Sequence, residues 1–133
     1  MCGIAGFAGL NKQSTHILAR MNNKISHRGP DDEGYYISDY DGLDEHLIGN
    51  DSVSLTEDFN HINKTQKKVN LGFAHRRLSI LDVSFRGHQP MSNLEGNLVI
   101  TYNGEVYNYL EIKTELSHLG YKFYSNSDTE VIL

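Results

Sequence analysis

Small and apolar residues, three of them glycines, fill the chain from Cys2 to Gly9. A short apolar run favours a buried strand, and glycine within a strand marks a place where another backbone approaches closely. No basic segment precedes the run, and polar Asn11 and Lys12 follow it, so it is neither a secretion signal nor a membrane span. We therefore expect a buried strand at the N-terminus.

A single cysteine among 133 residues excludes an internal disulfide. A chain of this length buries about two thirds of its unfolded surface, which is enough for one hydrophobic core and one domain. The formal net charge of -5 argues against a general nucleic-acid or membrane-surface binder. Because no secretion signal is present, we expect Cys2 to lie in a reducing, cytoplasmic setting.

Two segments show the apolar spacing and end signals of helices. In residues 15–25 the apolar side chains share one helical face, and either Ser14 or the threonine after it can cap the first turn. A second helix is expected to begin at Asn108, where Glu111 completes a capping box, and to end at Gly120.

The other apolar runs predict short strands separated by loops. Between two of these runs stand the polar residues His75, Arg76 and Arg77, which we expect to interrupt a pair of buried strands. The polar, acidic stretch 38–70 is interpreted as a surface excursion. The remaining expectations are strands at 71–74, 78–81 and 98–102, an Asn103-Gly104 hairpin turn with a return strand at 105–107, a strand-like stretch at 121–124 and a helix start at 127–130.

The position of Cys2 directly after the initiator methionine is the first chemical clue. If Met1 is removed, one residue carries a thiol of reference pKa about 8.5 and an α-amine of reference pKa about 7.7 to 8.0. The amine can then accept the thiol proton, so a single residue supplies both nucleophile and base. The alternative is a small, buried and inert cysteine.

Other polar residues could complete a site for an amino acid amide. The Asn103 side-chain amide and the Gly104 backbone N–H can stabilise an oxyanion, and the alternative is an ordinary hairpin turn. Arg77 suits a substrate carboxylate, or else forms a structural salt bridge. Asp128 and Glu105 can receive an ammonium group; otherwise they are a helix cap and a solvated strand residue.

Metal and phosphate chemistry find little support in the sequence. The histidines have no metal-ligand spacing with Cys2, and no second cysteine forms a CxxC pair. No GxxxxGK[ST] or GxGxxG stretch offers a phosphate cradle. We therefore expect no metal and no cofactor in this domain.

Six sequence blocks, in this order, cover nearly the whole chain. They are MCGIAGF at 1–7, HRGPDDEG at 27–34, AHRRLSILD at 74–82, GHQPM at 87–91, YNGEVYNY at 102–109 and SDTEVIL at 127–133. As a set they resemble the N-terminal glutaminase domain of class II glutamine amidotransferases, and among these the glutamine-hydrolysing asparagine synthetases. The resemblance implies an α+β fold, the four-layer αββα sandwich of the N-terminal nucleophile hydrolases.

The resemblance also implies an activity and a set of site residues. The activity is hydrolysis of L-glutamine to glutamate and ammonia through a thioester on processed Cys2. By this resemblance Asn103 and Gly104 match the oxyanion hole, Arg77 matches the residue that grips the α-carboxylate, Asp128 and Glu105 match the contacts near the α-amine, and Leu78, Ser79, Ile80 and Leu81 match the pocket wall. HRGPD and GHQPM are interpreted as loops that shape the site.

In the family the ammonia passes to a C-terminal synthetase domain, where ATP and Mg²⁺ are expected and which makes asparagine from aspartate. We expect this domain to be absent from the 133 residues and the glutaminase domain to be incomplete, with residues 38–70 as an insertion. Three alternatives stay open: a synthetase that amidates a sugar of a surface polysaccharide, a β-lactam-forming relative without glutaminase activity, and an inactive binding fragment. A homodimer is a further expected association.

Overall fold

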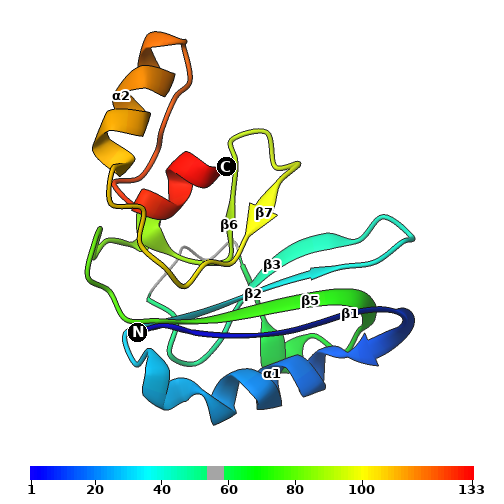
Figure 1. Ribbon diagram of the computed structural model, residues 1–133. Coiled ribbons are helices and arrows are strands. Elements are labelled where there is room, and N and C mark those ends of the chain that lie inside the picture. Colours follow the sequence, from blue (N-terminus) through cyan, green and yellow to red (C-terminus); the bar gives the residue numbers. More distant parts are fainter. Residues whose placement is uncertain (54–58) are drawn as a thin grey trace.

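The computed structural model describes residues 1–53 and 59–133. Strands, two α-helices and several 3₁₀ helices follow one another along this part of the chain (Figure 1). Their order is β1 (Gly3–Ser14), α1 (Thr15–Lys24), η1 (Ser26–Arg28), β2 (Asp32–Ser38), β3 (Asp44–Ile48), β4 (Asn60–His61), η2 (Ile62–Lys64), β5 (Lys68–Arg77), η3 (Phe85–Gly87), β6 (Met91–Ser92), β7 (Val99–Ile100), α2 (Tyr109–His118) and η4 (Asp128–Ile132).

A five-stranded sheet with the order β1-β5-β2-β3-β4 forms the body of the molecule. All its pairings are antiparallel except β3 with β4. At Gly6 a side chain would collide with the backbone, because an added Cβ would lie 2.7 Å from the Gly72 carbonyl oxygen. The expected close backbone approach is thus confirmed. The prediction of a buried strand at Cys2 to Gly9 is wrong for most of that run, because β1 forms one edge of the sheet and leaves Ile4 exposed.

Helix α1 packs against β1 and β5 and supplies Leu18 and Ala19 to the hydrophobic core. Its N-cap is Ser14, whose hydroxyl accepts a hydrogen bond from the His16 N–H, as the sequence predicts. The other buried members of the core are Tyr35, Ile37, Leu47, Ile62, Val69 and Ala74.

The two-stranded sheet of β6 and β7, the helix α2 and η4 lie on the side of the large sheet opposite α1 (Figure 1). Helix α2 occupies the expected range, but Asn108 makes no side-chain capping bond. No residue of α2 is buried, so its apolar side chains pack against little. The α+β class is confirmed, and the four-layer sandwich stays a prediction.

The chain from Lys68 to Arg77 forms one strand, so the prediction of two strands around a polar interruption is wrong. Strand β5 pairs with β1 on one side and β2 on the other, which satisfies the backbone through the polar trio. Opposite charges also compensate the burial, since Arg76 forms an ion pair with Glu33 at 2.9 Å. Residues 78–81 form no strand, and Ile80 is exposed.

No hairpin forms at Asn103-Gly104. Strand β7 pairs with β6 and not with residues 105–107, which are irregular, as are residues 121–124. Neither Asn103 nor Gly104 has the positive φ that a type I′ turn requires. The reason is tertiary, because side chains from elsewhere in the chain bind the backbone N–H groups of Tyr102 and Val106.

Residues 38–70 are more than a surface excursion, so that prediction is wrong in part. Strand β3 pairs with β2 over five residue pairs and joins the central sheet. Leu47 and Ile62 are only 1% and 2% exposed, because they fill the core beside α1 and β5. Leu47 and Ile62 thus fix this polar stretch to the domain.

Candidate functional site

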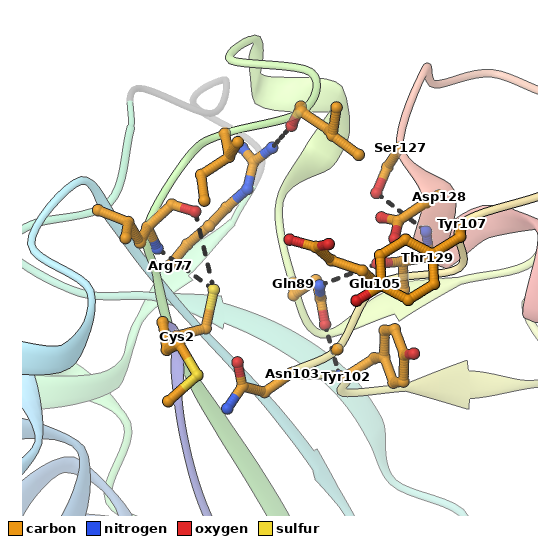
Figure 2. A pocket seen from close by; sticks show the side chains of 15 residues that line it. Cys2, Arg77, Gln89, Tyr102, Asn103, Glu105, Tyr107, Ser127, Asp128 and Thr129 are labelled. Carbon is orange, nitrogen blue, oxygen red and sulfur yellow. Dashed lines mark hydrogen bonds between the residues drawn. The ribbon is translucent and has the colours of Figure 1, made fainter. Parts of the chain in front are cut away.

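A pocket of about 350 Å³ opens where the start of β1, the end of β5, the segment after β7 and η4 meet (Figure 2). All the predicted site residues except Ser79 line it: Cys2, Arg77, Leu78, Ile80, Leu81, Asn103, Gly104, Glu105 and Asp128. The Ser79 backbone N–H is instead held by the Asp31 carboxylate at 2.8 Å. The structure therefore brings together residues that are more than a hundred positions apart in sequence.

The register of β1 and β5 places Cys2 beside Arg77. Gly3 lies opposite Arg76, so the next antiparallel position aligns Cys2 with Arg77. The Leu78 N–H donates to Cys2 Sγ at 3.3 Å, and the thiol lies 3.8 Å from the Leu78 carbonyl oxygen. These contacts fix the direction of a half-buried side chain that faces the pocket.

Backbone carbonyl groups hold the guanidinium of Arg77. Its Nη1 donates to the Ser84 oxygen at 3.2 Å, and its Nη2 donates to the oxygens of Leu81 and Asp82. Within 1–53 and 59–133 it forms no ion pair with a carboxylate, so the alternative of a structural salt bridge finds no support there. A buried cation with neutral partners keeps its charge for an anionic ligand.

Asp128 provides the opposite charge at the start of η4, where it is buried. Its Oδ2 accepts a hydrogen bond from the Val106 N–H at 2.9 Å. Among the described residues, no donor is bonded to Oδ1, so this oxygen can accept from an ammonium group. Glu105 also lines the pocket, but its side chain is exposed.

The two proposed oxyanion donors lie on an exposed segment beside Cys2. In the view of Figure 2, the Cys2 sulfur lies between Asn103 and Arg77. Gly104 has no room for a side chain, because an added Cβ would collide with the Tyr102 ring. The small residue therefore lets the Tyr102 side chain pack against this segment.

Sequence reasoning missed six residues that line the pocket: Met1, Gln89, Tyr102, Tyr107, Ser127 and Thr129. The GHQPM block pointed to the neighbourhood of Gln89 without indicating any chemistry. Tyr102, Tyr107, Ser127 and Thr129 stand within or next to blocks that were singled out, so their blocks were the available signal.

The HRGPDDEG and GHQPM blocks bind each other. His88 Nδ1 and Asp32 Oδ2 are 2.7 Å apart, and a Cβ on Gly34 would collide with the Gln89 carbonyl oxygen. The loop that carries Gln89 therefore packs directly on β2. This contact fixes the position of Gln89 in the pocket wall, which agrees with the interpretation of HRGPD and GHQPM as loops that shape the site.

His75 is buried in β5. Burial, with a smaller contribution from His88, lowers the pKa of His75 to about 4, so its ring is neutral at pH 7. Its Nδ1 lies 2.9 Å from the Thr101 hydroxyl, which precedes the proposed oxyanion residues. Within the part of the chain that the structure describes, no three His, Cys, Asp or Glu side chains could hold a metal ion together.

The fold brings a near-terminal cysteine, a buried arginine and a buried aspartate to one pocket. Residues 1–50 and 56–133 match the family described as glutamine amidotransferase domain. The chain belongs to this family of class II glutamine amidotransferases. None of the helices in the described residues is long and apolar enough to cross a membrane.

Among curated proteins, the chain is similar over its full length to two asparagine synthetases (glutamine-hydrolysing) of Bacillus subtilis strain 168. The identities are 36% to number 1 and 39% to number 2. It is also 31% identical, over 99% of its length, to the glutamine–fructose-6-phosphate aminotransferase (isomerizing) of Clostridium tetani. The chain spans only 17%, 14% and 21% of these three relatives.

Proposed function

We propose that this domain hydrolyses L-glutamine to L-glutamate and ammonia, with Cys2 as the nucleophile after removal of Met1. The observation that carries the proposal is that Cys2 lines the same pocket as a buried cation, Arg77, and a buried anion, Asp128. A free amino acid needs one cation for its α-carboxylate and one anion for its α-ammonium group. The side chain of the amino acid then extends toward the cysteine.

Removal of Met1 is the first requirement, because the peptide bond to Met1 takes away the basicity of the Cys2 nitrogen. Met1 is 78% exposed, which makes it accessible to an aminopeptidase. It also lines the pocket, so its removal leaves more room for the substrate.

In the acylation step the Cys2 amine takes the thiol proton and Sγ attacks the carboxamide carbon. The Asn103 side-chain amide and the Gly104 N–H stabilise the oxyanion that forms. The C–N bond then breaks as the protonated amine returns its proton to the departing nitrogen, which leaves as ammonia. A γ-glutamyl thioester on Cys2 remains.

In the second step the free amine takes a proton from water, and the resulting hydroxide attacks the thioester carbonyl. The C–S bond breaks, glutamate leaves and the thiol is restored with the proton that the amine held. No redox or metal chemistry is needed for this balance.

The fate of the ammonia is the wider part of the proposal. The similarity to asparagine synthetases supports transfer to an ATP- and Mg²⁺-dependent synthetase domain that makes asparagine from aspartate. The similarity to a glutamine–fructose-6-phosphate aminotransferase favours transfer of the nitrogen to a sugar phosphate as the second candidate. Amidation of a sugar of a surface polysaccharide stays a prediction from the sequence. The four-layer sandwich and a homodimer stay predictions, and so does the cytoplasmic location that the sequence predicts for Cys2.

The test uses the full-length protein and intact mass spectrometry before and after incubation with a diazo ketone analogue of glutamine. We expect a protein without Met1 that gains one adduct on Cys2, with protection by glutamine. In Cys2→Ala we expect no adduct and a loss of glutamine hydrolysis of at least about a thousandfold. Retained Met1, or normal turnover by Cys2→Ala, would contradict the proposal.

A further inference from the structure

The segment 102–106, which carries the proposed oxyanion donors, is held by one side-chain hydrogen bond at each end and forms no strand. The Tyr102 N–H donates to Gln89 Oε1 at 2.7 Å, and the Val106 N–H donates to Asp128 Oδ2 at 2.9 Å. Asn103 and Gly104 lie between these two hydrogen bonds and are exposed. The direction of the two donors therefore depends on side chains that come from other parts of the chain.

Gln89 bridges two sides of the pocket with one side-chain amide (Figure 2). Its Oε1 binds the Tyr102 N–H, and its Nε2 donates to Thr129 Oγ1 at 3.3 Å. Gln89 is only 6% exposed, so an unmade hydrogen bond of its buried amide would be costly.

The main chain around Gln89 is itself fixed to the large sheet. The neighbouring His88 is bound to Asp32 of β2, and the Gln89 carbonyl oxygen lies directly over Gly34 of the same strand. The hydrogen bond from the Tyr102 N–H to Gln89 thus connects the segment 102–106 to β2 of the large sheet.

We propose that Gln89 is a positioning residue, which aims the donors of Asn103 and Gly104 at the carbonyl oxygen of the substrate. This proposal rests on the proposed glutamine hydrolysis. Oxyanion donors act only within about 2.7–3.1 Å of the developing charge, and a displacement of about 1 Å in a catalytic geometry can cost about a hundredfold in rate. Gln89 acts through the backbone of Tyr102 and does not touch the reacting atoms.

The test compares Gln89→Leu and Gln89→Glu in the full-length protein by steady-state glutamine hydrolysis. Leucine lacks the acceptor for the Tyr102 N–H, so we expect kcat to fall about 10- to 100-fold. The KM for glutamine should stay within about threefold, since the carbonyl groups that hold Arg77 and the Asp128–Val106 bond are unchanged.

Gln89→Glu keeps an oxygen for the Tyr102 N–H and a second oxygen that can accept from the Thr129 hydroxyl. We expect it to restore kcat to within about fivefold of the wild type. A residue that merely filled space would show no such difference between leucine and glutamate.

Asn70→Leu is the matched control for general destabilisation. Asn70 is also a buried amide, and it donates to the carbonyl oxygens of Gly9 and Leu10, far from the pocket. We expect Asn70→Leu to lower the melting temperature at least as much as Gln89→Leu does and to leave kcat unchanged.

Wild-type kcat in Gln89→Leu, or a change confined to KM, would overturn the positioning role and leave the proposed hydrolysis standing. A wild-type protein without Cys2-dependent hydrolysis would overturn both. If Gln89→Leu does not fold, Gln89→Asn replaces it, because this side chain is one methylene too short to reach both Tyr102 and Thr129. The same loss of kcat is then expected.

Discussion

At the scale of single residues, Arg77 is a buried cation that only neutral main-chain groups hold in the described residues, which supports the ligand-binding role proposed for it. Arg77 is 5% exposed, and main-chain oxygens of the loop that follows it bind its guanidinium. Carbonyl groups orient a cation without cancelling its charge, unlike a carboxylate. Gly87 lies beside this guanidinium and leaves room for it, since a Cβ at Gly87 would collide with Arg77 Nη2.

Gly87→Ala should therefore displace the Arg77 guanidinium. We expect the KM for glutamine to rise about 10- to 100-fold, which corresponds to the loss of one charge-assisted hydrogen bond. Steady-state kinetics of the full-length protein measure this. Gly9→Ala is the control, because nothing lies within 4 Å of an added Cβ there. Equal KM values for the two variants would contradict the role assigned to Arg77.

Asp128→Asn separates two roles of the carboxylate. An asparagine oxygen can still accept from the Val106 N–H, whereas the charge for the α-ammonium group is lost. We expect the melting temperature to change little and the KM for glutamine to rise about 10- to 100-fold. A large fall in melting temperature at unchanged KM would show that the carboxylate only holds the backbone.

At the scale of elements, β5 places an arginine of a buried ion pair and an arginine of the pocket wall in neighbouring positions. Arg76 points into a buried network in which Glu33 also accepts from the Tyr35 hydroxyl at 2.7 Å. Arg77, the next residue, faces the pocket. The alternation of side chains along a strand separates the two roles.

Arg76→Met should leave Glu33 as a buried charge without its cation. We expect the free energy of unfolding to fall by about 3–5 kcal/mol. Adding Glu33→Gln should recover part of this loss, because the buried charge is then removed. Urea denaturation of the full-length protein and of both variants measures the difference.

A surface ion pair provides the comparison for this experiment. Lys67 pairs with Glu45 at the surface, and its side chain is 42% exposed. Lys67→Ala should cost less than about 1 kcal/mol. If Arg76→Met cost no more than this control, the buried pair would contribute little to stability.

At the scale of the whole molecule, two histidines, the buried His75 and the half-buried His46, link stability to pH. Burial, together with the neighbouring His88, lowers the pKa of both His46 and His75 to about 4. In the unfolded chain they titrate near 6.5. Between these values the unfolded state binds more protons than the folded state, so stability falls as the pH decreases from about 6.5 toward 4.

Melting temperatures measured between pH 7.5 and 4.5 should therefore decrease with falling pH. His75→Gln should show a shallower decrease, because one of the two titrating groups is gone. The same slope in the variant and the wild type would show that His75 is not the source. A melting temperature that rises with falling pH would contradict the linkage altogether.

Local sequence by itself determined both helices, the strand nature of the N-terminal run and the family, because these depend on periodicity, end residues and short blocks of neighbouring residues. All the site residues that the sequence named line the pocket, with Ser79 as the exception. Blocks that resemble a family carry this information without any knowledge of distances.

The tertiary structure alone decided the features that depend on partners distant in sequence. The polar centre of β5 continues as a strand because β1 and β2 flank it and Glu33 compensates Arg76. Asn103-Gly104 forms no hairpin because side chains from elsewhere in the chain bind the N–H groups of Tyr102 and Val106. The contacts of Gln89 span 13 and 40 residues, so no local pattern could indicate its role. Hydrogen-bond partners, and not propensity, set the geometry at these positions.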